Sequence, residues 1–147
     1  MSEHTHQIAG PNHSYPLLVR RKGGDELVSF LRQMAPRKRI LVVTDDVVSP
    51  LHAHDIVDQL NEGGCRTTLL SIGVGEACKT LVTIERLYDE ALKAGVDRQT
   101  LVVSIGGGVV GDIAGFLAAT LLRGLPLVHV PTTVLAQVDS SIGGKVG

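Results

Sequence analysis

The sequence predicts an α/β fold: a Rossmann-like, mostly parallel sheet with helices on both faces. Short β-branched runs alternate with helical patterns along most of the chain. One run, Ile40–Val43, is apolar at every position, which is typical of a strand covered on both faces of a parallel sheet. A glycine-rich turn, Gly106–Gly108, joins another such run to a helix, a connection common in α/β domains.

The composition fits one compact domain. The chain has 147 residues, of which 44% are hydrophobic and 20% charged, a size at which one core is usual. The net charge of -1 offers no basic surface for nucleic acid or an anionic membrane. The longest apolar stretch, around 113–122, is too short to cross a bilayer, and the polar start has no signal-peptide pattern. We expect no nucleic-acid partner, no membrane span and a cytoplasmic location.

The beginning of the chain is polar and rich in turn-forming residues. Residues 1–15 are therefore predicted to be a flexible tail ahead of an α/β domain over 16–147. Tyr15–Arg20 is predicted to form a strand. Asp25–Met34 is predicted to form a short helix, because its large apolar residues fall on one face.

The middle of the chain repeats a strand and a helix twice. Strands are predicted at Ile40–Val43 and Thr67–Ile72, followed by helices at 50–61 and 80–94. Glycines follow both helices as stop signals. The two cysteines lack the spacing of a zinc site and are too few for a disulfide framework, so both are expected to be reduced.

The last predicted elements surround the glycine-rich turn. A strand at Leu101–Ile105 precedes it, a helix runs from about Val109 to Arg123, and a strand follows at Leu127–Val130. The helix is apolar nearly all round, which predicts burial between other elements. Ligands of such sheets bind beyond the carboxyl ends of the strands, so functional residues are expected there.

The segment Gly106–Gly111 reads GGGVVG and matches the GxGxxG pattern between a strand and a helix. Glycines let a pyrophosphate approach the backbone, and the free amides at a helix N-terminus suit an anion. A tight turn without a ligand is the alternative. The usual ribose-binding acid about 20 residues downstream is missing, since Val130–Thr133 stands there. Asp45, after another strand, could hold the ribose or cap a helix.

Charged residues near the predicted helix ends allow two interpretations each. Glu76 and Lys79 could hydrogen-bond a cofactor or form a solvated capping pair. Asp112 is expected in the first turn of the glycine-preceded helix, where the helix dipole stabilises it with or without a ligand. Arg123 could neutralise the carbonyls at the end of that helix.

A second polar, glycine-rich segment, DSSIGGK, covers 139–145. Two such loops in one domain suggest a phosphorylated ligand. Arg123 and Lys145 are the candidate cations for its phosphate.

Three segments, GEACKT, GGGVVGDIAGFLAATLLRG and VPTTVLAQVDSSIGGKVG, stand in the order and spacing typical of 3-dehydroquinate synthase, and the chain resembles that family from about Ile40 to Gly147. The resemblance implies a nucleotide-binding α/β domain, followed in the family by a helical domain that carries a divalent metal, zinc or cobalt. NAD lies in the cleft between the two domains. The metal ligands, a Glu and two His, are expected downstream of Gly147, so no metal site is assigned to this chain.

The resemblance also implies roles by position. The residues implied to contact NAD are Asp45, Glu76, Lys79, Gly107, Gly108, Asp112, Thr132, Thr133, Asp139, Ser140 and Lys145. Asp139 and Lys145 would also act on the substrate, and Arg123 would face the substrate phosphate of the neighbouring subunit in a homodimer. One departure is Val47, where the family often has asparagine, and this weakens an adenosine-side contact.

The implied reaction converts 3-deoxy-arabino-heptulosonate 7-phosphate, a phosphorylated sugar acid, to 3-dehydroquinate with elimination of phosphate, which makes the enzyme a carbon–oxygen lyase. This is a step of the shikimate route to aromatic amino acids. The isolated chain is expected to bind NAD weakly and to be inactive. The alternatives are a valiolone-type or deoxy-inosose cyclase, a metal-dependent glycerol or alcohol dehydrogenase, and a non-catalytic NAD-binding fragment.

Overall fold

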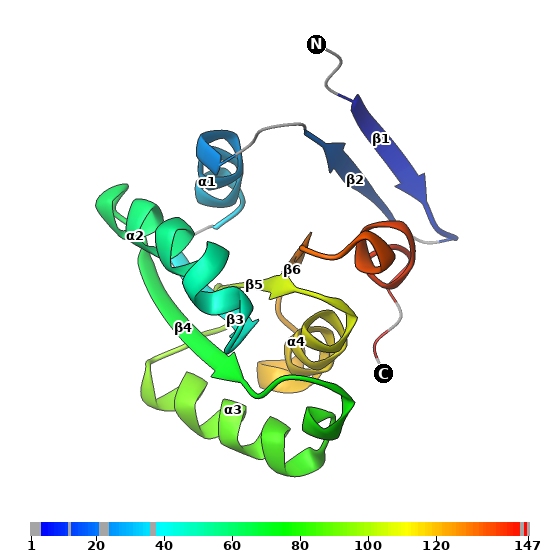
Figure 1. Ribbon diagram of the computed structural model, residues 1–147. Coiled ribbons are helices and arrows are strands. Elements are labelled where there is room, and N and C mark those ends of the chain that lie inside the picture. The colour runs from blue at the N-terminus through cyan, green and yellow to red at the C-terminus, as the bar shows by residue number, and fades with distance from the viewer. Residues whose placement is uncertain (1–3, 12, 21–23, 36–37, 145, 147) are drawn as a thin grey trace.

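The computed structural model describes residues 4–11, 13–20, 24–35, 38–144 and 146 (Figure 1). Its main sheet has four strands, all parallel, in the order β4-β3-β5-β6. The strands are β3 (Arg39–Asp45), β4 (Arg66–Ile72), β5 (Leu101–Gly106) and β6 (Leu127–Pro131). The predicted parallel α/β fold is confirmed, and each strand lies within one or two residues of its predicted bounds.

Helices cover both faces of this sheet (Figure 1). One face packs against α1 (Gly24–Met34) and α2 (His54–Glu62), and the other against α3 (Leu81–Lys93) and α4 (Gly108–Thr120). Among the described residues, every helix falls short of the length and apolarity that crossing a membrane requires.

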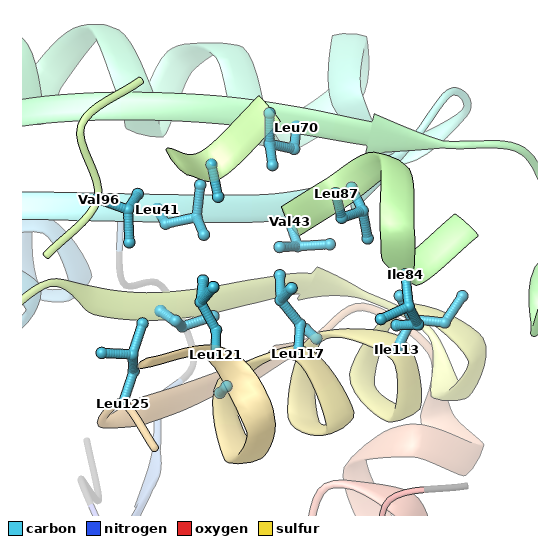
Figure 2. Close-up of a cluster of buried hydrophobic side chains, with 14 of the residues drawn as sticks. Leu41, Val43, Leu70, Ile84, Leu87, Val96, Ile113, Leu117, Leu121 and Leu125 are labelled. Carbon is cyan, nitrogen blue, oxygen red and sulfur yellow. The ribbon is translucent and has the colours of Figure 1, made fainter. Parts of the chain in front are cut away.

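Alternate side chains of β3 explain its uninterrupted apolar sequence. Leu41 and Val43 pack toward α3 and α4 (Figure 2), whereas Ile40 and Val42 pack toward α1 and α2. All four are at most 1% exposed. A strand with helices on both sides buries both of its rows of side chains, so no polar residue alternates with the apolar ones.

Two predicted helices have different ends in the structure. The segment predicted as one helix over 50–61 begins with a π-helical turn, η1 (Ser49–Ala53), before α2. The predicted end at Arg123 is wrong, because α4 ends at Thr120 and a short 3-10 segment, η3 (Leu121–Arg123), follows. The chain folds back there, so that the Leu125 amide donates to the Ala118 carbonyl at 2.7 Å, and this contact closes the helix end.

The N-terminal residues form a separate antiparallel hairpin of β1 (His4–Ala9) and β2 (Ser14–Val19), which stands apart from the main sheet (Figure 1). The strand predicted at Tyr15–Arg20 corresponds to β2. Much of the region 1–15 that was expected to be a tail is therefore a strand. Cross-strand backbone pairing creates β1, and the polar side chains of HTHQIA have no apolar alternation that would indicate it.

Candidate functional site

The carboxyl ends of the adjacent strands β3 and β5 mark the point where the strand order of the sheet reverses. After β3 the chain crosses to β4 on one side, and after β5 it crosses to β6 on the other. Such a switch point is where open α/β sheets bind ligands. The buried Thr44 hydroxyl donates to the Ile105 carbonyl at 2.8 Å and joins the two strand ends. Asp45 and Gly106 are the last residues of these strands, so both lie at the switch point.

The glycine-rich turn lies tightly against the segment that follows β6. Gly107 caps α4 and Gly108 is its first residue. A Cβ atom on Gly107 would lie 3.3 Å from Cγ2 of Thr133, and one on Gly108 would lie 3.2 Å from Oγ of Ser140. A side chain at either position would therefore require the Thr133 or Ser140 side chain to shift by a few tenths of an ångström. Because the turn has no side chains of its own, none of them covers the backbone amides at the start of α4, and a pyrophosphate could approach these amides.

Three glycines of α4 share one face of the helix. Gly108, Gly111 and Gly115 are three and four residues apart. Cβ atoms placed on them would point at Ser140, at the His129 ring (3.6 Å) and at Val146, respectively. Strand β6 and the polypeptide after it therefore approach α4 along its glycine face.

The segment after β6 brings several predicted residues to the glycine-rich turn. The Thr132 amide donates to the Gly106 carbonyl at 2.9 Å. The Thr133 hydroxyl accepts the Ala136 amide at 3.1 Å and begins a π-helical segment, η4 (Ala136–Ser140), which the sequence did not predict. Asp139 is exposed on η4, and its side chain has no hydrogen bond or ion pair with the described residues. The structure thus places Thr132, Thr133 and Ser140 beside the turn and leaves the Asp139 carboxylate in solvent.

Lys79 links the loop after β4 to the helix after the glycine-rich turn. Its Nζ lies 2.6 Å from Oδ2 of Asp112 and 3.2 Å from Oε2 of Glu76. The hydrogen bond from Lys79 to Asp112 raises the pKa of Lys79, and partial desolvation opposes this rise. Glu76 belongs to a short 3-10 turn, η2 (Glu76–Cys78), and is mostly exposed. The predicted pair of Glu76 and Lys79 therefore forms one cluster with Asp112, which was predicted separately.

The predicted position of Asp112 in the first turn of α4 is wrong, because α4 begins at Gly108 and Asp112 lies in its second turn. The ion pair with Lys79, more than the amides at the helix terminus, holds this carboxylate.

Asp45 caps the turn that follows β3. Its Oδ1 accepts the amides of Val47 at 2.9 Å and Val48 at 2.8 Å. Asp45 thus caps a turn and not a helix, because the N-cap of the following segment η1 is Val48, which has no side-chain cap. Oδ2 accepts no hydrogen bond from the described residues, so one carboxylate oxygen remains available to a ligand hydroxyl.

His129 and Ser104 form a polar pair beneath the turn that sequence reasoning missed. The Ser104 hydroxyl and His129 Nδ1 are 2.7 Å apart, and both residues line a small hollow with Gly106, Gly111 and Ser140. Burial lowers the pKa of His129, and the negative charge of Asp112 partly opposes this effect. The two residues are register partners on β5 and β6. One polar residue at matching positions of two otherwise apolar strands is the signal that could have identified them.

Of the two predicted phosphate-binding cations, one lies away from this site and the other falls outside the described residues. Arg123 is exposed beyond the far end of α4, at the opposite edge of the sheet from the glycine-rich turn. Lys145 lies outside the described residues. Within the described ranges, no three His, Cys, Asp or Glu residues gather as a metal site would require, and Cys65 and Cys78 are free thiols.

Comparison with protein families and curated proteins places this arrangement among known enzymes. The family model described as 3-dehydroquinate synthase N-terminal matches residues 69–147. A curated 3-dehydroquinate synthase from Desulforamulus reducens is 45% identical over 142 residues, which cover 97% of this chain and 40% of that protein. The chain therefore spans about two fifths of the length of this relative.

Solved structures of sugar-phosphate cyclases have the same fold. A 2-deoxy-scyllo-inosose synthase, complexed with carbaglucose-6-phosphate, NAD+ and Co²⁺, has a TM-score of 0.78 and 29% identity over 93% of this chain and 38% of its own. A 2-epi-5-epi-valiolone synthase from Streptomyces hygroscopicus, with NAD+ and Zn²⁺ bound, has a TM-score of 0.68 and 33% identity over 74% of this chain and 31% of its own.

Proposed function

Because the chain belongs to the 3-dehydroquinate synthase family, we propose that it is the NAD-binding portion of an enzyme that converts 3-deoxy-arabino-heptulosonate 7-phosphate to 3-dehydroquinate with elimination of phosphate. That reaction belongs to the cytoplasmic shikimate route to aromatic amino acids. The chain matches about 40% of its curated relative, so the remaining substrate contacts and the divalent metal, zinc or cobalt, are assigned to the part of the relatives that it does not match. Alone, it binds NAD weakly and does not turn over.

The observation that carries this proposal is the glycine-rich turn at the switch point. Gly107 and Gly108 keep the backbone at the start of α4 free of side chains, so a pyrophosphate could approach its amides. A Cβ at either position would come within 3.3 Å of Thr133 or 3.2 Å of Ser140, closer than ordinary contact. Asp45 ends the neighbouring strand with one oxygen free for a ribose hydroxyl. The residues present therefore fit a dinucleotide. When bound, NAD supplies a group that accepts and returns a hydride.

Lys79 contributes an ammonium group near this turn, and two carboxylates fix its position. An ammonium group has three donors, and Asp112 and Glu76 take two of them. The third is available to a phosphate oxygen of the nucleotide. Asp112 positions Lys79, because it holds the ammonium from the helix that begins at the turn.

The proposed enzyme is a homodimer, as the resemblance to the family implies, and the position of Arg123 is compatible with it. This residue lies at the sheet edge opposite the turn, so its guanidinium could not bind substrate held by its own subunit at the turn. In the proposed homodimer, Arg123 reaches the phosphate of the sugar acid bound to the neighbouring subunit.

A second candidate is a cyclase acting on another sugar phosphate. The TM-score of 0.78 to the 2-deoxy-scyllo-inosose synthase favours it. The 45% identity to the 3-dehydroquinate synthase, against 29% to the inosose synthase, favours the first function.

Phosphate release separates these candidates. We would join this chain to the unmatched part of the Desulforamulus reducens relative and supply NAD and Co²⁺. Release from 3-deoxy-arabino-heptulosonate 7-phosphate by the joined protein, and none by the chain alone, is expected. Release only from a hexose 6-phosphate would favour the second candidate. Turnover by the chain alone would contradict its proposed incompleteness.

A further inference from the structure

The N-terminal hairpin reaches the second glycine-rich segment near the other end of the chain. The Gly143 amide donates to the Tyr15 hydroxyl at 2.7 Å, across 128 positions of sequence. Figure 1 shows the turn end of the hairpin beside η4, which precedes this segment. Tyr15 is half-buried in β2 and pairs with Ile8 of β1. The hydrogen bond therefore connects two parts of the molecule that no shared strand joins.

The hairpin is attached at its other end as well. Arg20, directly after β2, forms an ion pair with Glu26 of α1 at 3.3 Å. The hairpin strands are mostly exposed, and two paired strands alone are marginally stable in water. The hairpin therefore contacts the rest of the described chain at both of its ends, through Glu26 of α1 and through Gly143.

The segment that Tyr15 contacts is held to α4 at both of its ends. Ser140 lies over Gly108 and Val146 lies over Gly115. Between these anchors, Gly143 and Gly144 have φ angles of 96° and 75°, in the left-handed region. Glycines lose more backbone entropy than other residues when they become ordered. The Tyr15 hydroxyl accepts the amide of the first of these two left-handed glycines.

We propose that Tyr15 is a positioning residue of the nucleotide site: its hydroxyl holds the Gly143 amide and orders the turn over 141–144 before the nucleotide binds. The inference rests on the proposed binding of NAD. A turn that is ordered in the free protein loses less entropy when the ligand arrives, so the nucleotide binds more tightly. Tyr15 acts through the turn and need not touch the ligand.

The test uses the two tyrosines of the chain. Tyr15→Phe removes only the hydroxyl that accepts the Gly143 amide. Tyr88→Phe is the matched control, because it removes a hydroxyl paired with Thr120 at the far end of α4. The exchange rate of the Gly143 amide is measured by NMR without nucleotide, and NAD affinity is then measured by titration of the same samples.

Tyr15→Phe should speed Gly143 exchange and weaken NAD binding about two- to tenfold, as expected for one lost hydrogen bond. Tyr88→Phe should change neither quantity. Unchanged Gly143 exchange or unchanged affinity in Tyr15→Phe would overturn the inference. If the wild-type chain binds no NAD, the proposed function is what fails, and the exchange rate alone then decides whether Tyr15 orders the turn.

Discussion

The ammonium nitrogen of Lys79 lies 2.6 Å from Oδ2 of Asp112, across 33 positions of sequence. This contact joins the loop after β4 to the helix that begins at the glycine-rich turn. Both side chains are largely sheltered, at 25% and 17% exposure, so the pair is less screened than a surface ion pair.

Replacing Lys79 should reveal this pair through the pH dependence of stability. The pKa of Lys79 is raised above its ordinary value of 10.5 in the folded chain. The folded state therefore holds the proton more tightly, so the stabilisation is complete below pH 10.5 and is lost as the pH rises through the folded pKa. The difference in unfolding free energy between wild type and Lys79→Met, measured by urea denaturation, should be constant from neutral pH up to 10.5, where both carboxylate partners are ionised, and shrink above 10.5. A difference independent of pH would show that the charge of Lys79 does not stabilise the fold.

Adding one methyl group at the glycine-rich turn should weaken nucleotide binding. Gly108→Ala places a Cβ 3.2 Å from Ser140 Oγ, so Ser140 must shift by a few tenths of an ångström, and the added methyl group lies over the amides at the start of α4. We expect NAD affinity to fall by at least about tenfold, roughly 1.4 kcal/mol. Gly24→Ala is the control, since a Cβ there meets nothing within 4 Å, and it should bind NAD as wild type does. Equal affinities of all three proteins would exclude this turn as the pyrophosphate site.

The half-buried imidazole of His129 should make the chain less stable in mild acid. Its pKa is lowered from 6.5, so below that pH the unfolded state takes up the proton more readily than the folded state. Unfolding free energy should fall as the pH drops from 6.5 toward the folded pKa. His129→Asn keeps a polar partner for Ser104 and removes this titration. As the pH falls below 6.5, the unfolding free energy of the variant should therefore rise relative to that of wild type. Parallel plots of unfolding free energy against pH for the two proteins would contradict the prediction.

Truncating a core side chain of α4 should lower the free energy of unfolding substantially. Leu117 is 0% exposed and packs between α4 and the sheet (Figure 2). Leu117→Ala should lower the free energy of unfolding by about 2–5 kcal/mol, through lost burial and the cavity left behind. Leu81→Ala, at a position 77% exposed, should change it by less than about 0.5 kcal/mol. Chemical denaturation measures both, and similar losses for the two variants would contradict the packing described.

The sequence was sufficient to predict the sheet and its helices because their signals are local. Ile40–Val43 is apolar throughout because helices cover both of its faces, and the near-uniform apolarity of α4 correctly indicated its burial. The end of that helix was mispredicted because the reversal depends on the Leu125 amide, which belongs to the next segment. Strand β1 was missed because only its pairing with β2 defines it.

The sequence identified individual site residues, but it did not predict which of them are in contact. The residue types around Gly106 indicated a nucleotide, whereas the Lys79 and Asp112 contact joins two helical units that local spacing cannot relate. The same limit applies to His129, whose partner Ser104 lies 25 positions earlier on the neighbouring strand.

The glycine face of α4 also bears on the order of folding. A glycine inside a helix costs about 1 kcal/mol relative to alanine, and α4 contains Gly111 and Gly115 within thirteen residues. Short helices are marginal in water even without such losses. A peptide with the α4 sequence should therefore be largely non-helical in isolation. In the whole chain, the helix should form late in folding, after β5 and the segment after β6 provide the surfaces against which it packs.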